Sequence, residues 1–150
     1  MIKKLDNTDV TIGEQIYTVF QNSYKIEAKL LNATNFPPLK RTVKEFTESN
    51  TKFFGYFKDN HLAAVIELII KPEYIHIRSL VVEPIFFKQG IASELIKFTF
   101  KKFDSILYIV ETGQKNYPAI KLYEKHGFKL VKEWLTDINI MKVKLEKTNY

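Results

Sequence analysis

Tyr123 is a candidate for chemistry in this sequence, because a phenol with a pKa near 10 can give a proton to a leaving group. It lies in residues 116–128, Asn-Tyr-Pro-Ala-Ile-Lys-Leu-Tyr-Glu-Lys-His-Gly-Phe. This segment predicts a short helix that begins after a polar cap, Asn116, and ends at Gly127. From the residues alone, Tyr123 is either a proton donor or a core tyrosine, and Asn116 is either a ligand contact or an N-cap.

An anion site is predicted where a second helix begins. An apolar strand ends near Val82, and after a short loop a helix is expected to open at Gly90. The first N–H groups of a helix lack internal partners and carry partial positive charge, so they can hold a phosphate. Gly90 allows close approach and Lys88 can add charge. A Gly-x-Gly-x-x-Gly pattern and a Walker loop are both absent, which excludes those two nucleotide-binding motifs.

Two side chains on predicted strands are candidates for a general base. His76 lies in a strand expected over 74–82, where alternation places it on one face with Arg78 and Leu80. The unperturbed pKa of histidine, about 6.5, suits this task. Glu67 interrupts an apolar strand, so its carboxylate needs a partner or a wet cleft. The alternatives are water-mediated deprotonation, an ordinary surface role for His76, and simple pairing of Glu67 with Arg78 or a lysine.

Composition excludes several other classes of protein. The sequence has no cysteine and its three histidines are far apart, so neither a thiol nucleophile nor a metal site is predicted. The net charge is +6, but the lysines are scattered and no arginine-rich tract appears, which speaks against a nucleic-acid partner. No apolar run is long enough for a membrane helix, and the N-terminus lacks a secretory signal. A cytoplasmic protein without a membrane partner is expected.

Hydrophobic periodicity predicts the elements that position these residues. We expect, in chain order, a strand at 2–5, a helix at 10–31 capped by Asp9, an extended Pro-Pro turn within 32–40, a helix to about residue 49 with a capping box at Thr42 and Glu45, strands at 52–58, 62–71 and 74–82, a helix at 90–103, a strand at 105–110, a helix at 116–126, and strands at 128–134 and 138–145. Strand-helix-strand units imply parallel pairing in the middle and hairpins imply antiparallel pairing elsewhere. The predicted fold is a single α/β (α+β) domain over 1–150, a mixed sheet of about seven strands flanked by about four helices.

The two motifs together resemble the GNAT superfamily of acyl-CoA-dependent N-acetyltransferases. Residues 87–92, Phe-Lys-Gln-Gly-Ile-Ala, are similar to the family's pyrophosphate-binding signature at Gly90 and Ala92. They depart from it at Phe87, where Gln or Arg is usual. Residues 116–128 match the family's second motif in the spacing of Asn, Ala, Tyr, Gly and Phe.

The resemblance, which covers about residues 2–145, implies transfer of an acetyl group from acetyl-CoA to a primary amine by direct attack in a ternary complex. It implies that Tyr123 protonates the CoA thiolate, that the Leu80 N–H holds the thioester oxygen, and that Asn116 contacts the pantetheine arm. His76 falls four residues before Leu80, where several members of the family carry a Glu or His. The implied cofactor contacts are Leu80, Val81, Val82, Lys88, Gln89, Gly90, Ile91, Ala92, Ser93, Asn116, Ala119 and Tyr123.

The acceptor amine stays open at this point. The loop 35–39 and the turn 135–137 are expected to shape its pocket, and small molecules and peptides are both candidates: aminoglycosides, polyamines, amino acids, arylalkylamines, protein N-termini and lysines. A homodimer is compatible with the resemblance. The main alternative function is a non-catalytic acyl-CoA-binding sensor or subunit, and a second alternative is a basic nucleic-acid-binding module.

Overall fold

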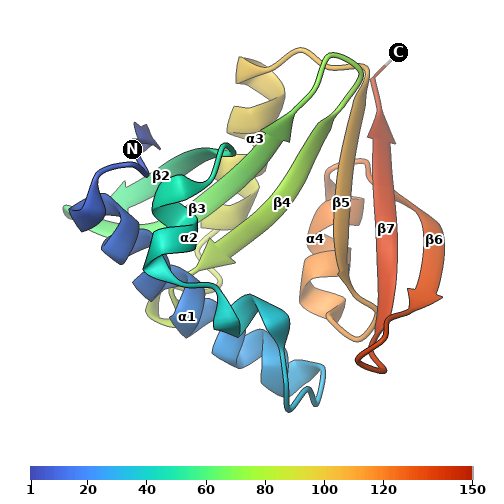
Figure 1. Ribbon diagram of the computed structural model, residues 1–150. Coiled ribbons are helices and arrows are strands. Elements are labelled where there is room, and N and C mark those ends of the chain that lie inside the picture. The colour runs from blue at the N-terminus through green and yellow to red at the C-terminus, as the bar shows by residue number, and fades with distance from the viewer. Residues whose placement is uncertain (150) are drawn as a thin grey trace.

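A computed structural model describes residues 1–149, which form one mixed sheet with helices on both faces (Figure 1). The helices are α1 (Val10–Leu30), η1 (Pro37–Lys40), α2 (Val43–Glu48), η2 (Pro84–Phe86), α3 (Ile91–Lys102) and α4 (Tyr117–Lys125), η1 and η2 being short 3-10 helices. The strands are β1 (Ile2–Leu5), β2 (Lys52–Lys58), β3 (His61–Ile70), β4 (Ile75–Val82), β5 (Leu107–Gly113), β6 (Lys129–Leu135) and β7 (Met141–Thr148).

The strands are ordered β1-β2-β3-β4-β5-β7-β6. Only the β4–β5 pair is parallel among these strands, and the other neighbours are antiparallel. The parallel pair is the one joined through α3, as expected for a strand-helix-strand crossover. The predicted fold class, a mixed seven-stranded sheet with four α-helices, is confirmed.

Local sequence signals explain where the helices begin. The Asp9 carboxylate accepts hydrogen bonds from the N–H groups of Thr11 and Ile12, which caps α1. Thr42 and Glu45 exchange side-chain and backbone hydrogen bonds in a capping box at the start of α2. Both caps were predicted, because the groups involved are at most three residues apart.

Two apolar cores join the helices to the sheet. On one face, Phe20 of α1 and Phe46 of α2 pack with Phe53 of β2. On the other face, α3 and α4 pack on the sheet through side chains that include Leu95 and Tyr123. Figure 1 shows α1 and α2 in front of the sheet and α3 and α4 behind it. Burial of these side chains supplies most of the driving force that holds the layers together.

The strands β4 and β5 separate along their length. Their register joins residues 75–77 to residues 108–110 and stops there, although β4 continues to Val82 and β5 to Gly113. The two strands diverge below this short ladder in Figure 1. Backbone groups that would pair within a continuous sheet are therefore available to other partners beyond Ile77 and Val110.

A β-bulge interrupts the alternation of side chains in β4. Ser79 is paired with Glu67 of β3, and Ile77 is paired with the next residue, Leu68. Arg78 is thus the extra residue, and a bulge of this kind shifts which face the following side chains occupy.

The bulge corrects one prediction. Leu80 packs against the same core as Ile77, whereas His76 precedes Ile77 and points to the opposite face of the sheet. His76 and Leu80 therefore lie on opposite faces, and the prediction that they share a face was wrong. A strict period of two cannot reveal a bulge, because the extra residue leaves no mark in the hydrophobic pattern of β4.

Other differences concern the bounds of elements. The Pro-Pro segment forms η1 rather than an extended turn, because the fixed φ of proline also fits a 3-10 helix. The strand predicted to end at residue 110 continues through Glu111 and Thr112 to Gly113, where it borders cavities instead of the core. The last strand lies three residues further along than predicted, at Met141–Thr148.

Two searches of the described residues bear on membranes and metals. In residues 1–149, no helix has both the length and the apolar character required to cross a bilayer. The same residues contain no group of three or more His, Cys, Asp or Glu side chains that could hold a metal ion.

Candidate active site

A cavity of about 510 Å³ lies where β4 and β5 separate, and we call it the β4–β5 cleft. Its walls come from α1, β4, the loop before α3, the start of α3, the end of β5 and α4. The structure brings all but one of the predicted cofactor contacts into this lining: Leu80, Val82, Lys88, Gln89, Gly90, Ile91, Ala92, Ser93, Asn116, Ala119 and Tyr123. The predicted contact that is missing is Val81, which is buried in the core under α1 on the other face.

Two backbone N–H groups of β4 point into this cleft. The Glu83 N–H donates to the Ala63 carbonyl of the neighbouring strand at 2.8 Å. Because hydrogen bonding alternates along an antiparallel pair, the N–H groups of Leu80 and Val82 point away from β3 and toward the cleft. The Val81 N–H points toward β3, so the geometry speaks against the predicted contact there.

The start of α3 is open to a ligand. Gly90 is the N-cap residue and has φ +77°, a left-handed conformation that favours glycine. Apart from Gly90 and its two neighbours in the chain, no atom lies within 4 Å of the position where a Cβ at Gly90 would be. The Ser93 hydroxyl lies 3.0 Å from His126 Nε2 and so links α3 to the end of α4. Phe87, at the departure from the family signature, is 40% exposed and lines the cleft.

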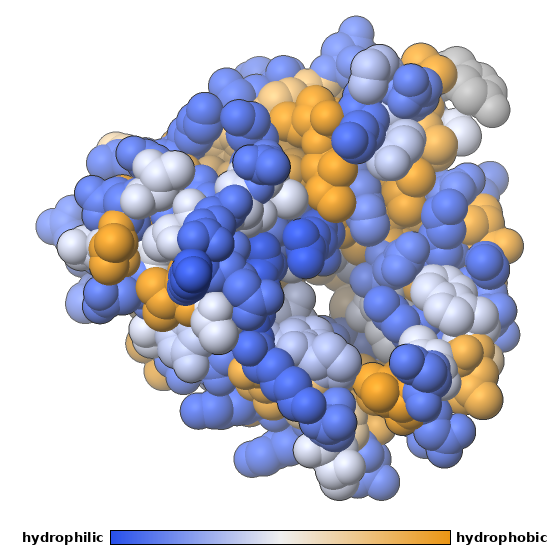
Figure 2. Space-filling view, viewed as in Figure 1, coloured by the Kyte–Doolittle hydropathy of each residue, from blue (hydrophilic) through white to orange (hydrophobic). Residues whose placement is uncertain are grey.

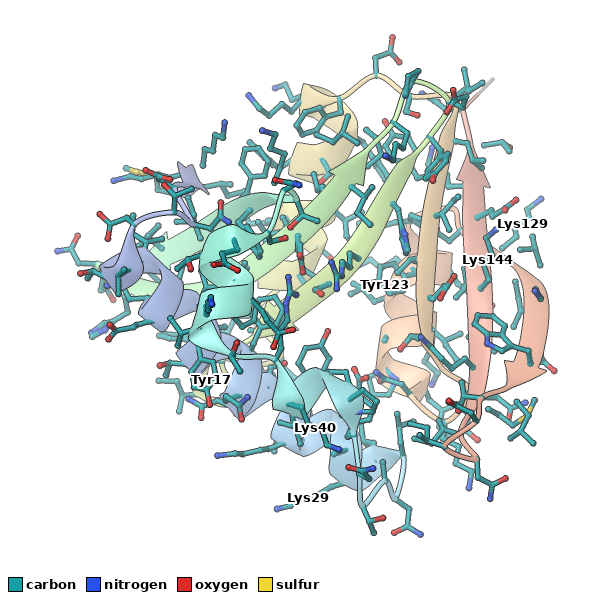
Figure 3. All side chains as sticks on the ribbon, in the orientation of Figure 1. Tyr17, Lys29, Lys40, Tyr123, Lys129 and Lys144 are labelled. Carbon is teal, nitrogen blue, oxygen red and sulfur yellow. The ribbon has the colours of Figure 1, made fainter. Side chains whose placement is uncertain are left out.

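Tyr123 lies between the diverging strands (Figure 3). It comes from α4 and packs edge-to-face on Phe128, with 5.4 Å between the ring centroids. Burial, with Tyr24 and Glu27 nearby, raises the pKa of Tyr123 well above its ordinary value. The hydroxyl therefore keeps its proton throughout the physiological pH range, as a proton donor must.

Asn116 connects α4 to α1. Its side-chain oxygen accepts from the Ala119 N–H, which confirms the N-cap interpretation. Its Nδ2 donates to Glu27 Oε1 at 3.0 Å and to Thr112 Oγ1 at 3.3 Å. The amide thus holds a carboxylate of α1 beside the end of β5. The predicted contact of Asn116 with a pantetheine arm stays a prediction.

A second cavity of about 590 Å³ adjoins the cleft on the α1–α2 face, and we call it the η1 cavity. It lies among α1, η1, the end of β5 and the β6–β7 turn, so both regions predicted to shape an acceptor pocket contribute to it. Figure 2 shows a hollow near the middle of this face with mostly hydrophilic residues around it. The residues that line both cavities are Tyr24, Glu27, Arg78, Ser79, Glu111 and Thr112.

Two carboxylates stand at this junction. Burial raises the pKa of Glu27 to about 7, although Lys142 and the hydrogen bond from Asn116 act in the opposite direction. Glu111 is paired with Lys142 at 3.7 Å between Oε1 and Nζ. A carboxylate with a pKa near the working pH is well suited to accept a proton.

The structure places Glu67 behind the junction residues Ser79 and Arg78, in a buried ion pair. Arg41 donates to both carboxylate oxygens of Glu67 at 2.7 Å, and Ser79 and Thr51 donate at 3.0 Å and 2.6 Å. Burial by itself would raise the pKa of Glu67, but Arg41, Thr51 and Arg78 outweigh it and hold the pKa below its usual value. Within residues 1–149, Glu67 lines neither cavity, and this placement favours a structural role.

His76 is also outside the lining of both cavities among the described residues. Burial lowers its pKa, and Arg78, Lys142 and Lys144 act in the same direction, while Glu111 opposes them. A base role for His76 stays a prediction, but the geometry favours a carboxylate at the junction.

Replacing Glu67 by glutamine is expected to lower the free energy of unfolding by about 3–5 kcal/mol, because the buried Arg41 guanidinium loses its counter-charge. Since the pKa of Glu67 is lowered, this stabilisation is present above the ordinary carboxyl pKa of about 4.3 and is lost as the pH falls below it. Urea denaturation at pH 7 measures the loss. Glu48→Gln, which removes an exposed partner of Lys44, is the control and is expected to change stability by less than about 0.5 kcal/mol. Equal stability of the Glu67 variant and the wild type would contradict the structural role.

Sequence reasoning missed Tyr24, Glu27 and Glu111 as site residues. Glu27 follows Tyr24 by three positions, on the continuation of the apolar stripe of α1, and that spacing could have revealed a carboxylate facing inward. Glu111 follows the predicted end of its strand, so no local signal placed it in a site.

Comparisons with known proteins agree with this geometry. A family model described as the acetyltransferase (GNAT) family matches residues 14–128. The chain is 33% identical over 129 residues to the UPF0157 protein YqkA of Bacillus subtilis (strain 168), a match that covers 85% of this chain and 38% of that protein. The chain therefore spans well under half the length of this relative.

Solved structures share the fold. The PaiA N-acetyltransferase of Thermoplasma acidophilum in complex with coenzyme A aligns with a TM-score of 0.72 and 22% identity, covering 99% of this chain and 98% of that one. The ribosomal-protein-S18-alanine N-acetyltransferase of Escherichia coli aligns with a TM-score of 0.77 and 18% identity, covering 99% and 92%. At these identities, the likeness concerns the arrangement of helices and strands.

Proposed function

Because the chain belongs to the acetyltransferase (GNAT) family, whose model matches residues 14–128, we propose that it transfers an acetyl group from acetyl-CoA to a primary amine in a ternary complex. The observation that carries the proposal is the junction of two cavities. Tyr123 and the outward N–H groups of β4 line one cavity, the acceptor would enter through the other, and Glu27 lines both. Direct transfer needs both substrates bound at one reacting centre at the same time, and two adjoining cavities provide room for this.

The residues of the β4–β5 cleft fit acetyl-CoA. The N-terminus of α3, with Gly90 open to close approach and Lys88 beside it, would hold the pyrophosphate. The Val82 N–H would bond an amide of the pantetheine arm, and Ala119 leaves room along α4. Acetyl-CoA supplies the acetyl group as a thioester, which is broken when the amine forms its amide.

Each chemical role falls to a group that lines the β4–β5 cleft. The Leu80 N–H would donate to the thioester oxygen and stabilise the charge that develops on it. Glu27 would take a proton from the acceptor ammonium, which frees the lone pair that attacks the carbonyl carbon. Tyr123 would give its proton to the departing sulfur and regain one from the new amide nitrogen. One proton is released for each acetyl group transferred.

Burial supports the role of Tyr123. The environment that raises the pKa of the phenol would also raise the proton affinity of a thiolate expelled next to it. The phenol of Tyr123 and the thiolate that it protonates would therefore share the same buried environment.

Calorimetric titration with acetyl-CoA, followed by thiol release with a panel of primary amines, tests the proposal. Micromolar binding together with amine-dependent thiol release is expected. Binding without release for any amine would favour the non-catalytic acyl-CoA-binding alternative, and no binding at high micromolar acetyl-CoA would overturn the proposal. A homodimer and a cytoplasmic location stay predictions.

Gly90→Ala is expected to raise the Kd for acetyl-CoA about tenfold, because its Cβ would stand where the phosphate must approach the backbone. Alanine in the left-handed conformation of residue 90 is also expected to lower the free energy of unfolding by about 1 kcal/mol. Gly127→Ala is the matched control, since Gly127 has φ +92° after α4 and does not line the cleft among the described residues. The control is expected to lose similar stability and keep its affinity. Equal affinities of the two variants for acetyl-CoA would contradict a pyrophosphate site at Gly90.

A further inference from the structure

The arginines of this chain are concentrated in one place. Only two of its 23 basic residues are arginines, Arg41 and Arg78, and both line the η1 cavity. The planar guanidinium group can bind a carboxylate through two parallel hydrogen bonds, which a lysine cannot do. Their shared position therefore suggests recognition of an anionic group.

The two arginines differ in how far they are already engaged. Arg41 is 13% exposed and forms a two-pronged pair with Glu67, with both distances 2.7 Å. Arg78 is 47% exposed, and its Nη1 lies 3.8 Å from Glu67 Oε2, which is too far for a hydrogen bond. No hydrogen bond of the Arg78 side chain is found within residues 1–149.

The hydrogen-bond acceptor positions of Glu67 are already occupied, so none is left for Arg78. Each of its carboxylate oxygens already accepts from Arg41 and from one hydroxyl, Ser79 for Oε1 and Thr51 for Oε2. Two guanidinium groups share the Glu67 carboxylate, and Arg78 is the partly exposed one of the two; the Glu45 carboxylate also lines the η1 cavity. Arg78 is the bulge residue of β4, and its side chain lines both cavities.

The opposite side of the junction carries two carboxyl groups, Glu27, whose pKa is raised to about 7, and Glu111, which is paired with Lys142. Both groups line the same two cavities as Arg78, so one ligand in these cavities could present an ammonium to a carboxylate and an anion to Arg78. The remainder of the η1 cavity includes the apolar side chains Leu31, Phe36 and Ile138. A ligand that matches all three features has an ammonium and a carboxylate close together and a bulky apolar substituent.

We propose that the acceptor is a free amino acid with a large apolar side chain, whose carboxylate is bound by Arg78 while its ammonium faces Glu27 and Glu111. The inference rests on the proposed acetyl transfer and names its substrate class. The apolar side chain lies along Leu31, Phe36 and Ile138, and the amine is directed to the β4–β5 cleft. The reaction is the one described above, and its product is an N-acetylated amino acid.

Thiol release by the full chain with acetyl-CoA tests the substrate class. The acceptors are L-phenylalanine and L-leucine, their carboxamides, phenethylamine, which lacks the carboxylate, and O-phosphoethanolamine, which carries a phosphate instead. The value of kcat/KM for the two amino acids is expected to exceed that for their amides by about 10- to 100-fold, as for a charge-assisted two-pronged contact. Equal or faster turnover of the amides, or a preference for the phosphate, would overturn the proposal.

Arg78→Gln is expected to reduce this discrimination to less than about threefold, mainly by lowering kcat/KM for the amino acids. Arg78→Lys keeps the positive charge but cannot form two parallel hydrogen bonds, so it is expected to retain only part of the discrimination between amino acids and amides. Lys44→Gln removes one positive charge from the exposed surface of α2 and controls for net charge. Its discrimination is expected to match that of the wild type, and an equal loss in this control would overturn the assignment to Arg78.

Calorimetric titration of each variant with acetyl-CoA separates the two proposals. If acetyl-CoA binds and neither amino acids nor amides release thiol, the substrate class fails while the cofactor site stands. If acetyl-CoA does not bind the wild type, the proposed function itself fails. If Arg78→Gln weakens acetyl-CoA binding as much as it lowers turnover, Arg78 belongs to the cofactor site and the inference is overturned.

Discussion

Tyr123→Phe is expected to lower kcat by about 10²–10⁴-fold, the range for loss of a positioned proton donor. The ring, which packs on Phe128 in the core below the cleft, is retained, so the affinity for acetyl-CoA is expected to stay within about twofold. An equal fall in kcat and kcat/KM identifies a group that acts in the transition state, because substrate binding is unaffected. Steady-state thiol release and calorimetric titration on the same protein preparations measure the two quantities.

Tyr117→Phe is the matched control for this experiment. Tyr117 lies in the same helix but is 63% exposed and is outside the lining of the cleft among the described residues. Its variant is expected to keep both kcat and affinity. If Tyr123→Phe also kept its full kcat, the sulfur would be protonated by another group or by water, and the assignment of Tyr123 as general acid would be wrong.

Glu27→Gln is expected to lower kcat/KM about 100-fold at pH 8 and to remove the rise in kcat/KM near pH 7. The base form of Glu27 accumulates as the pH increases through its pKa of about 7, so wild-type activity should rise through that value and then level off. Glutamine cannot accept the proton, but its oxygen can still accept the hydrogen bond from Asn116. The local structure is therefore preserved while the chemistry is lost, and a pH series of kcat/KM tests the change.

Glu27→Gln is expected to lower activity at high pH but to raise the free energy of unfolding there, relative to the wild type. Unfolded Glu27 ionises near the ordinary pKa of about 4.3, while the folded chain keeps the proton up to about pH 7. The folded state thus binds more protons between these values, and the wild type loses stability as the pH rises through them. The stability of Glu27→Gln relative to the wild type should increase from pH 4 to pH 8, as measured by thermal unfolding.

Glu111→Gln identifies the alternative base. Glu111 lines both cavities as Glu27 does, but it is paired with Lys142. If Glu27 is the base, the Glu111 variant keeps the rise in kcat/KM near pH 7. If the rise vanishes in Glu111→Gln and persists in Glu27→Gln, the role belongs to Glu111. If it persists in both, His76→Asn becomes the next variant to measure.

The ion pair between Arg41 and Glu67 has a consequence for the acceptor proposal. The Glu67 carboxylate fixes the position of Arg41 beside the η1 cavity. It does not neutralise both arginines, because Arg78 lies close to the same carboxylate. If the acceptor proposal holds, Glu67 contributes to recognition by positioning Arg41 and Arg78, and its predicted role as a base stays a prediction. This is why the stability test on Glu67 and the specificity test on Arg78 are expected to give different kinds of result.

Local sequence determined the features whose partners lie within a few residues. The caps at Asp9, Thr42 and Asn116 were predicted, because each bonds N–H groups two or three positions away. Gly90 and Tyr123 were placed correctly at the start of α3 and in the body of α4, and these positions also carry the family resemblance. Periodicity and turn chemistry determined the order of elements and thereby the fold class.

Tertiary structure alone decided which side chains meet at the junction and what state they adopt. Asn116 and Glu27, which share a hydrogen bond, are 89 residues apart, and Arg41, which donates to both oxygens of Glu67, is 26 residues away from it. The bulge at Arg78 and the separation of β4 from β5 depend on pairing between strands and on packing against α3 and α4. The pKa of Glu27 depends on burial by segments distant in sequence. Burial, ion pairing and strand register depend on residues that are distant in the sequence, so they cannot be predicted from a short segment of adjacent residues.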